Sequence, residues 1–252
     1  MLLDLLFFSL LIQAVLFVAA FIKQTDKLTD FSYGLTFVIL AITGLFQSSK
    51  LVGHYILTAM IVLWALRLAV YLVIRIRKIK KDKRFDGIRE KFLSFAGFWL
   101  LQGITIWVVL ISSIFYYQEA VEFNSLSIIG MAIYLFGLYF ESLADMQKYR
   151  HINNPNNKDR WIQTGLWKYS RHPNYFGEIC VWLGVYLFVF PTLHFPLSLI
   201  ALLSPLYITI LLLFVSGIPK LEKYADNRWG NDQEYLKYKE STSILIPWFN
   251  KK

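Results

Sequence analysis

The residues best suited to chemistry lie in one polar stretch between two apolar runs. Glu141 and Asp145 are four residues apart, and so are Asn174 and Glu178. A spacing of four places both members of each pair on one face of a helix. Arginines in the same stretch could hold phosphate through paired N–H groups, and they are Arg150, Arg160 and Arg171. The pattern favours a pocket for a nucleotide cofactor that enters from the cytosol.

Glu178 is the most informative of these residues because it begins an otherwise apolar helix. The five residues that follow it are Ile-Cys-Val-Trp-Leu. An ionisable group at membrane depth is costly, so it is a functional-site hypothesis by default. A second interpretation stays open for the others, because helix-end acids often only pair with nearby lysine or arginine. Basic residues beside a membrane often only contact lipid headgroups.

The composition indicates a membrane protein. Hydrophobic residues make up 56% of the 252 residues and charged residues only 17%, whereas soluble proteins carry about 25% charged residues. This balance argues against a disordered chain, a disulfide scaffold and a nucleic-acid-binding domain. The single cysteine, Cys180, excludes an internal disulfide and suits core packing.

We predict an all-α polytopic membrane protein of one domain, residues 1–252, with about seven transmembrane helices. A spanning helix needs about 20 mostly apolar residues. The apolar runs that approach this length are residues 2–22, 31–46, 51–74, 95–116, 127–143, 175–190 and 196–218. The first run lacks the positive start of a signal peptide, so we expect it to remain as an uncleaved helix.

The basic residues predict the orientation. With seven spans, all of the 26 lysines and arginines except Lys50 and Arg67 fall in connections on one side. Such an excess marks the cytoplasmic side. We therefore expect the amino terminus outside and the carboxyl terminus in the cytoplasm. The endoplasmic reticulum and a bacterial inner membrane fit equally well.

Other motifs give no competing site. No Gly-x-Gly-x-x-Gly and no P-loop pattern occurs, so a Rossmann or Walker nucleotide site is unsupported. The four histidines lack the spacing of metal ligands, and we predict no metal site. Gly130 and Gly137 lie seven residues apart on one helix face, which favours helix packing.

Residues 171–178, Arg-His-Pro-Asn-Tyr-Phe-Gly-Glu, resemble a superfamily signature. The superfamily comprises membrane steroid 5-alpha-reductases, sterol reductases and isoprenylcysteine carboxyl methyltransferases. The whole chain resembles the DUF1295 family, bacterial and protist relatives of steroid 5-alpha-reductase. Further blocks occur in order along the chain, and they are Trp64-Ala-Leu-Arg67-Leu, Phe85-Asp86, Leu101-Gln102-Gly103, Glu141-x-x-x-Asp145, Ile218-Pro-Lys-Leu-Glu222 and Tyr235-x-x-Tyr238-x-x-x-Thr242-Ser243-x-Leu-Ile246-Pro247-Trp248.

The resemblance implies a seven-helix fold that holds NADPH among the cytoplasmic halves of the later helices, within residues 141–252. It implies cofactor contacts for Asp145, Arg160, Asn174 and Glu178. Glu141 stands where the steroid reductases have asparagine. Further implied contacts are Tyr169, Arg171, His172, Tyr175 and Arg228.

The chain differs from the steroid enzymes at the residues that activate the substrate ketone. Those enzymes activate the ketone with a glutamate in an early helix and a tyrosine in the third helix. This chain has no acidic residue near Gln47, and Trp64 stands at the tyrosine position. The departure argues against a steroid enone and leaves the catalytic group unassigned. Tyr55 and Tyr71 are the nearest hydroxyls in the third span.

The combined pattern predicts an NADPH-dependent membrane reductase. Its hydride acceptor would be an activated C=C bond of a steroid or other apolar lipid that enters from the bilayer. One alternative is an S-adenosylmethionine-dependent membrane methyltransferase, which has no phosphate to neutralise and would not need Arg160. Another is a non-catalytic lipid-binding membrane protein that retained the fold. No nucleic-acid partner is expected.

Overall fold

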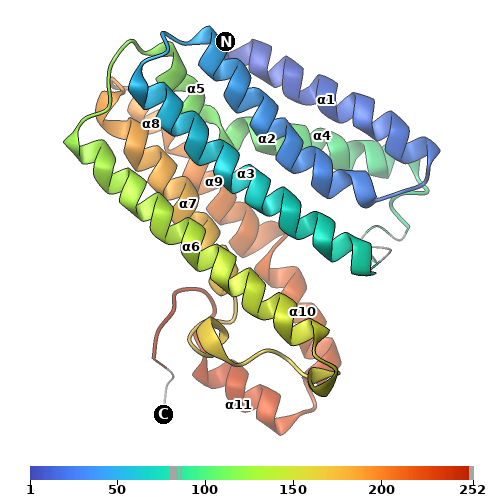
Figure 1. Ribbon diagram of the computed structural model, residues 1–252. Helices are drawn as coiled ribbons and strands as arrows, with labels where there is room; N and C mark the ends of the chain where they lie inside the picture. The colour runs from blue at the N-terminus through green and yellow to red at the C-terminus, as the bar shows by residue number, and fades with distance from the viewer. Residues whose placement is uncertain (80–84, 86, 250–252) are drawn as a thin grey trace. The chain divides into compact units, whose positions relative to one another are not determined.

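The described part of the chain is mostly helical. The computed structural model describes residues 1–79, 85 and 87–249, and these residues form helices with no strand (Figure 1). Seven of the helical segments among them are long and apolar enough to cross a membrane. The all-α prediction and the predicted number of spans are therefore confirmed.

Some of the residues that carry the predictions lie outside the described residues. For the orientation they are Lys80, Lys81, Lys83, Arg84, Lys251 and Lys252, and for the Phe85-Asp86 block it is Asp86. The orientation of the termini stays a prediction.

The chain forms two compact units, which are described separately. Unit 1 comprises residues 1–130 and 185–204, and unit 2 comprises residues 131–184 and 205–252. The prediction of one membrane domain stays a prediction.

Unit 1 contains the first four predicted spans. Its helices include α1 (Leu2–Ile22), α2 (Lys27–Gln47), α3 (Val52–Ile79), α4 (Phe92–Val109), α5 (Ile111–Gln118) and α8 (Leu197–Ala201). Helix α2 packs against α1 and α3, and α4 packs against α1 (Figure 1). The carboxylate of Glu122 accepts hydrogen bonds from the backbone N–H groups of Val52 and Gly53, so it caps the start of α3.

The fourth predicted span, residues 95–116, is two helices instead of one. The helix breaks at Leu110, where ψ is −2°. The Ser204 hydroxyl donates a hydrogen bond to the Val109 carbonyl beside the break. A buried carbonyl that loses its helical partner needs another donor, and Ser204 supplies it.

A buried network of polar side chains joins α1, α2 and α4 in unit 1. The Gln102 amide nitrogen donates to Gln13 Oε1 at 3.0 Å, to Ser32 Oγ at 2.8 Å and to the Thr29 carbonyl at 3.1 Å. The Gln13 amide nitrogen donates to Thr36 Oγ1 at 2.8 Å. We call these five residues the glutamine network. Because the members bond to one another, the network links the three helices at little desolvation cost.

Unit 2 contains most of the fifth and sixth predicted spans. Its elements are α6 (Ser125–Asn153), the turns η2 (Pro155–Asn157) and η3 (Gly165–Lys168), α7 (Pro173–Val189), α9 (Leu203–Ile210), the π-helical η5 (Leu211–Val215), α10 (Ile218–Trp229) and α11 (Gln233–Ser241). Helices α6 and α9 begin in unit 1, and α7 ends there. The Asp232 carboxylate caps α11 by accepting from the backbone N–H groups of Glu234 and Tyr235.

The seventh predicted span, residues 196–218, is interrupted. It consists of α8, α9 and the π-helical turn η5, and the polar helix α10 follows it. Gly217 lies at the junction, where a Cβ would come within 2.4 Å of the Leu212 carbonyl oxygen. The chain can therefore turn here only with glycine.

Glycines allow α6 and α7 to pack closely. A Cβ at Gly137 would lie 2.6 Å from the Val181 backbone nitrogen, and one at Gly130 would lie 2.2 Å from that of Phe188. The predicted packing role of these two glycines is confirmed. Gly177 of α7 similarly lies against the Glu141 backbone of α6.

Candidate functional site

The carboxyl-terminal half of α6 presents a polar stripe. Glu141, Asp145, Lys148 and Ile152 follow one another at spacings of four, three and four, so they share one helix face. Glu141 and Asp145 are buried, with 3% and 5% of their surface exposed. Lys148 and Ile152, nearer the helix end, line a pocket. The stripe thus runs from buried carboxylates to an open cavity.

The start of α7 meets this stripe. The Asn174 amide nitrogen donates to Asp145 Oδ1 at 3.2 Å. The contact is possible because Gly177 brings the two backbones together beside Glu141. Three of the predicted residues, Glu141, Asp145 and Asn174, therefore form one cluster. Glu178 lies one turn further along α7 and is half-buried.

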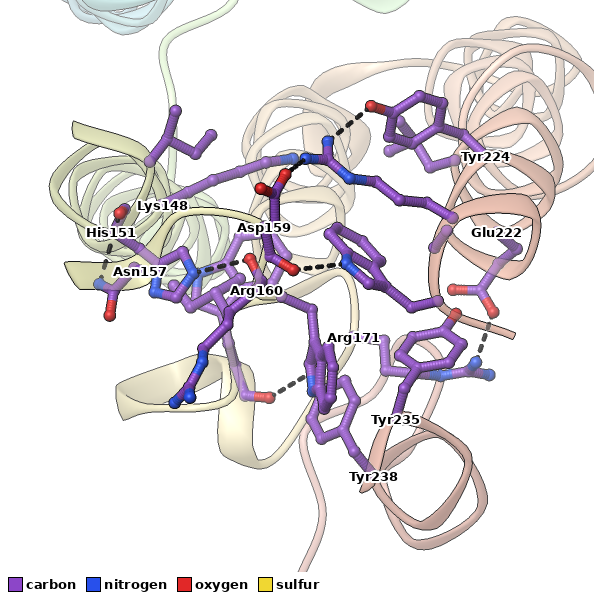
Figure 2. Close-up of a pocket in the computed structure, with 18 of the residues that line it drawn as sticks. Lys148, His151, Asn157, Asp159, Arg160, Arg171, Glu222, Tyr224, Tyr235 and Tyr238 are labelled. Carbon is purple, nitrogen blue, oxygen red and sulfur yellow. Dashed lines mark hydrogen bonds and ion pairs between the residues drawn. The ribbon is translucent and has the colours of Figure 1, made fainter. Parts of the chain in front are cut away.

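Unit 2 encloses a pocket of about 610 Å³ (Figure 2). This volume falls within the range of about 300–1,000 Å³ that is usual for ligand sites. The lining residues come from the end of α6, the following loop, α10 and α11. They are Lys148, His151, Ile152, Asn157, Lys158, Asp159, Arg160, Trp161, Ile162, Trp167, Arg171, His172, Leu221, Glu222, Tyr224, Ala225, Arg228, Trp229, Tyr235 and Tyr238.

Positive charge exceeds negative charge in this lining. The five cationic side chains face two carboxylates, those of Asp159 and Glu222. Glu222 pairs with Arg171, and Asp159 pairs with Arg228. The Arg160 side chain has no hydrogen bond or ion pair with any residue that the structure describes. An uncompensated guanidinium beside a cavity favours an anionic ligand.

Aromatic side chains form another part of the lining. Trp161 and Tyr235 meet edge to face, with ring centroids 5.3 Å apart at 73°, and Trp229 lies 6.0 Å from both. The Trp161 indole N–H is buried and has no hydrogen-bond partner among the described residues. Such an orphan donor is costly unless a ligand accepts from it. Flat rings with an available donor suit a planar heterocycle.

His172 links the pocket to the start of α7. Its Nε2–H donates to Glu222 Oε1 at 2.8 Å, and its ring stacks on that of Tyr175 at 5.7 Å between centroids. Burial lowers the pKa of His172 below its usual value, although the bond to Glu222 acts in the opposite direction. The imidazole is therefore neutral at pH 7 and serves as a fixed donor to the carboxylate.

The structure gathers most of the predicted cofactor residues in unit 2, in two adjoining groups. Arg160, Arg171, His172 and Arg228 line the pocket, whereas Arg150 and Tyr169 are exposed and are not part of its lining. The second group is the cluster of Glu141, Asp145 and Asn174 described above. Their roles in binding stay predictions.

The two predicted catalytic candidates lie on α3 in unit 1. Tyr55 is 51% exposed, and Tyr71 is half-buried. Their catalytic role also stays a prediction.

Several lining residues were missed in the sequence. Lys148 follows Asp145 by three residues and Glu141 by seven, and this helical spacing was the signal that could have identified it. The others are Trp161, Trp167, Glu222, Tyr224, Trp229, Tyr235 and Tyr238. Glu222, Tyr235 and Tyr238 occur in the blocks of the resemblance but had no assigned role there. The tryptophans carried no signal of their own in an aromatic-rich chain.

Comparison with known protein families gives a match over most of the chain. The profile of a family described as "Protein of unknown function (DUF1295)" matches residues 16–242. No curated protein and no solved structure matches the chain.

Proposed function

Since the chain belongs to the DUF1295 family, we propose that it is an NADPH-dependent membrane reductase. The hydride acceptor is an activated C=C bond of an apolar lipid that enters from the bilayer. The observation that carries the proposal is the pocket of unit 2, with its excess of cations, its uncompensated Arg160 and its aromatic lining.

The lining fits the chemistry of a phosphorylated dinucleotide. NADPH has several phosphate groups, including one that NADH lacks, and arginine binds phosphate through two parallel hydrogen bonds. Trp161 and Trp229 provide ring faces for a planar base, and the free indole N–H of Trp161 provides a donor. Bound NADPH would supply the hydride, and the protein would bind and orient it.

The cluster at the start of α7 fits the remaining polar groups of such a cofactor. Asp145 can accept hydrogen bonds from hydroxyl or amide groups, and Asn174 can both donate and accept. The Asp145–Asn174 bond holds these side chains in place, and the spacing of α6 residues connects them to the pocket. The protein's contribution is therefore positioning, with the cofactor fixed at several points.

A ligand screen tests the proposal directly. The purified protein in detergent is heated with NADPH, NADH or S-adenosylmethionine, and the unfolding temperature is recorded. We expect saturable stabilisation by NADPH, less by NADH and none by S-adenosylmethionine, because a ligand that binds only the folded state stabilises it.

The rival functions predict other results. A membrane methyltransferase would be stabilised by S-adenosylmethionine and not by NADPH. A non-catalytic lipid-binding protein would respond to none of the three. Either result would refute the reductase.

A further inference from the structure

We propose that the carboxyl-terminal segment, residues 243–249, is an interfacial anchor that inserts its apolar side chains into the membrane surface beside the start of α7. The inference concerns a surface outside the pocket and does not depend on NADPH binding.

The segment is fixed to the loop that precedes α7. The Arg171 backbone N–H donates to the Ser243 carbonyl at 2.8 Å, and the Trp248 N–H donates to the Tyr169 carbonyl at 3.1 Å. Between them, the Ser170 hydroxyl donates to the Leu245 carbonyl at 2.7 Å. Ser170 and Ser243 also form an isolated parallel bridge. The segment is therefore a bent strap that is tied to residues 169–171 at several points.

This attachment determines how close the strap lies to the membrane. Helix α7 begins at Pro173 and is one of the candidate membrane spans. The residues that hold the strap lie two to four positions before that start. A chain paired with these positions lies at the level where the span meets water, which is the interfacial region of the bilayer.

The strap exposes most of its apolar side chains. Ile244, Ile246, Trp248 and Phe249 expose 45%, 60%, 70% and 78% of their surface. All four lie within six consecutive residues of the strap. The intervening Leu245 and Pro247 are half-buried. A group of exposed apolar side chains in one short segment marks a binding surface in a protein.

The composition of this surface favours lipid as its occupant. Tryptophan and other aromatic side chains concentrate at membrane interfaces, where a ring meets both acyl chains and headgroups. The ring of Phe249 also packs edge-on against that of Tyr169, which extends the surface toward α7. The ammonium of Lys168 lies 5.8 Å from the centre of the Tyr169 ring. A cation beside an apolar patch suits anionic headgroups.

Depth measurement in nanodiscs tests the anchor. A nitroxide spin label is attached to Ile246→Cys or Trp248→Cys in a Cys180→Ala background, and its relaxation by oxygen and by a water-soluble nickel chelate is compared. Glu234→Cys is the control because it is exposed on α11 in the same unit. We expect a several-fold higher ratio of oxygen to nickel accessibility at 246 and 248 than at 234.

Two results would overturn the anchor. Labels at 246 and 248 that respond to nickel as strongly as the label at 234 would place the strap in water. Labels shielded from both reagents would indicate a protein partner instead of lipid. Unfolding temperatures of the labelled variants show that each one is folded, and no cofactor is added. Failure of the anchor and failure of the reductase are therefore separate results.

Discussion

The glutamine network of unit 1 and the pocket of unit 2 use polar groups in opposite ways. In the network, Gln13 and Gln102 bond to one another and to neighbouring hydroxyls. In the pocket, Arg160 lacks a partner among the described residues, and the Trp161 N–H lacks an acceptor there. Polar groups that satisfy each other hold helices together, whereas polar groups that remain unsatisfied beside a cavity indicate a ligand.

Unit 2 also contains two kinds of ion pair. Glu222 holds Arg171 and His172 in place, and its side chain is only 17% exposed. Asp159 pairs with Arg228 at a more exposed position, where both side chains are over 40% exposed. The first pair supports the pocket wall, and the second contributes little to stability because water screens it.

Removing the carboxylate of Glu222 should have the largest effect. Glu222→Ala leaves the Arg171 guanidinium and the His172 N–H mostly buried without their acceptor. We expect a loss of about 3 kcal/mol of stability, as for other broken buried pairs. Thermal unfolding in detergent measures it, with the exposed Glu234→Ala as the matched control. An equal loss of stability in the two variants would show that Glu222 does not hold Arg171 and His172 in place.

Removing the charge of Arg160 should weaken binding without loss of stability. Arg160→Gln deletes a cation that nothing in the described structure neutralises. A hydrogen bond to a charged group contributes about 1.5–3 kcal/mol, so NADPH affinity should fall roughly ten- to a hundredfold. NADH affinity should fall less if Arg160 binds the additional phosphate.

Fluorescence titration of both cofactors measures this preference. Lys237→Gln on α11 is the control, because it removes a positive charge from an exposed position outside the pocket lining. Unchanged affinity for NADPH in the Arg160 variant would show that Arg160 does not bind a phosphate of the cofactor.

Disrupting the glutamine network should affect stability alone. Gln102→Leu leaves Gln13 and Ser32 without a shared donor, and polar contacts between membrane helices contribute about 0.6–1.7 kcal/mol. We expect a small decrease in unfolding temperature and unchanged NADPH affinity. A variant with normal stability and impaired cofactor binding would show that the network serves binding and not the packing of the helices.

Acidification should have the smallest effect. The folded-state pKa of His172 is lowered, so the unfolded chain binds more protons between that pKa and about 6.5. Stability should therefore decrease as the pH falls through this window, by less than about 1.4 kcal/mol per pH unit. His172→Gln keeps a neutral donor for Glu222 and should flatten this part of the pH profile of thermal unfolding. An unchanged profile would show that other groups cause the pH dependence.

The amino-acid sequence predicts the spans well because hydropathy is a local property. The two broken spans could not be predicted, since the break at Leu110 depends on the hydroxyl of Ser204, which is distant in sequence. The glutamine network could not be predicted from the sequence for the same reason. Its members come from three helices, and no spacing within one helix connects them.

The candidate site was predictable in part. Glu141, Asp145 and Asn174 follow helical spacing and come together as expected. The aromatic lining was not predictable, because Trp161, Trp229 and the α11 tyrosines come from separate segments and meet only in the fold. Glu178 was singled out by its apolar surroundings, and its contact with a cofactor stays a prediction.

A structure of the protein determined with NADPH would show directly whether the pocket of unit 2 binds the cofactor. We expect cofactor density in the pocket of unit 2, with a phosphate within hydrogen-bonding distance of the Arg160 guanidinium and an aromatic base against Trp161 or Trp229. Density for NADPH elsewhere, or an empty pocket at saturating NADPH, would contradict this expectation.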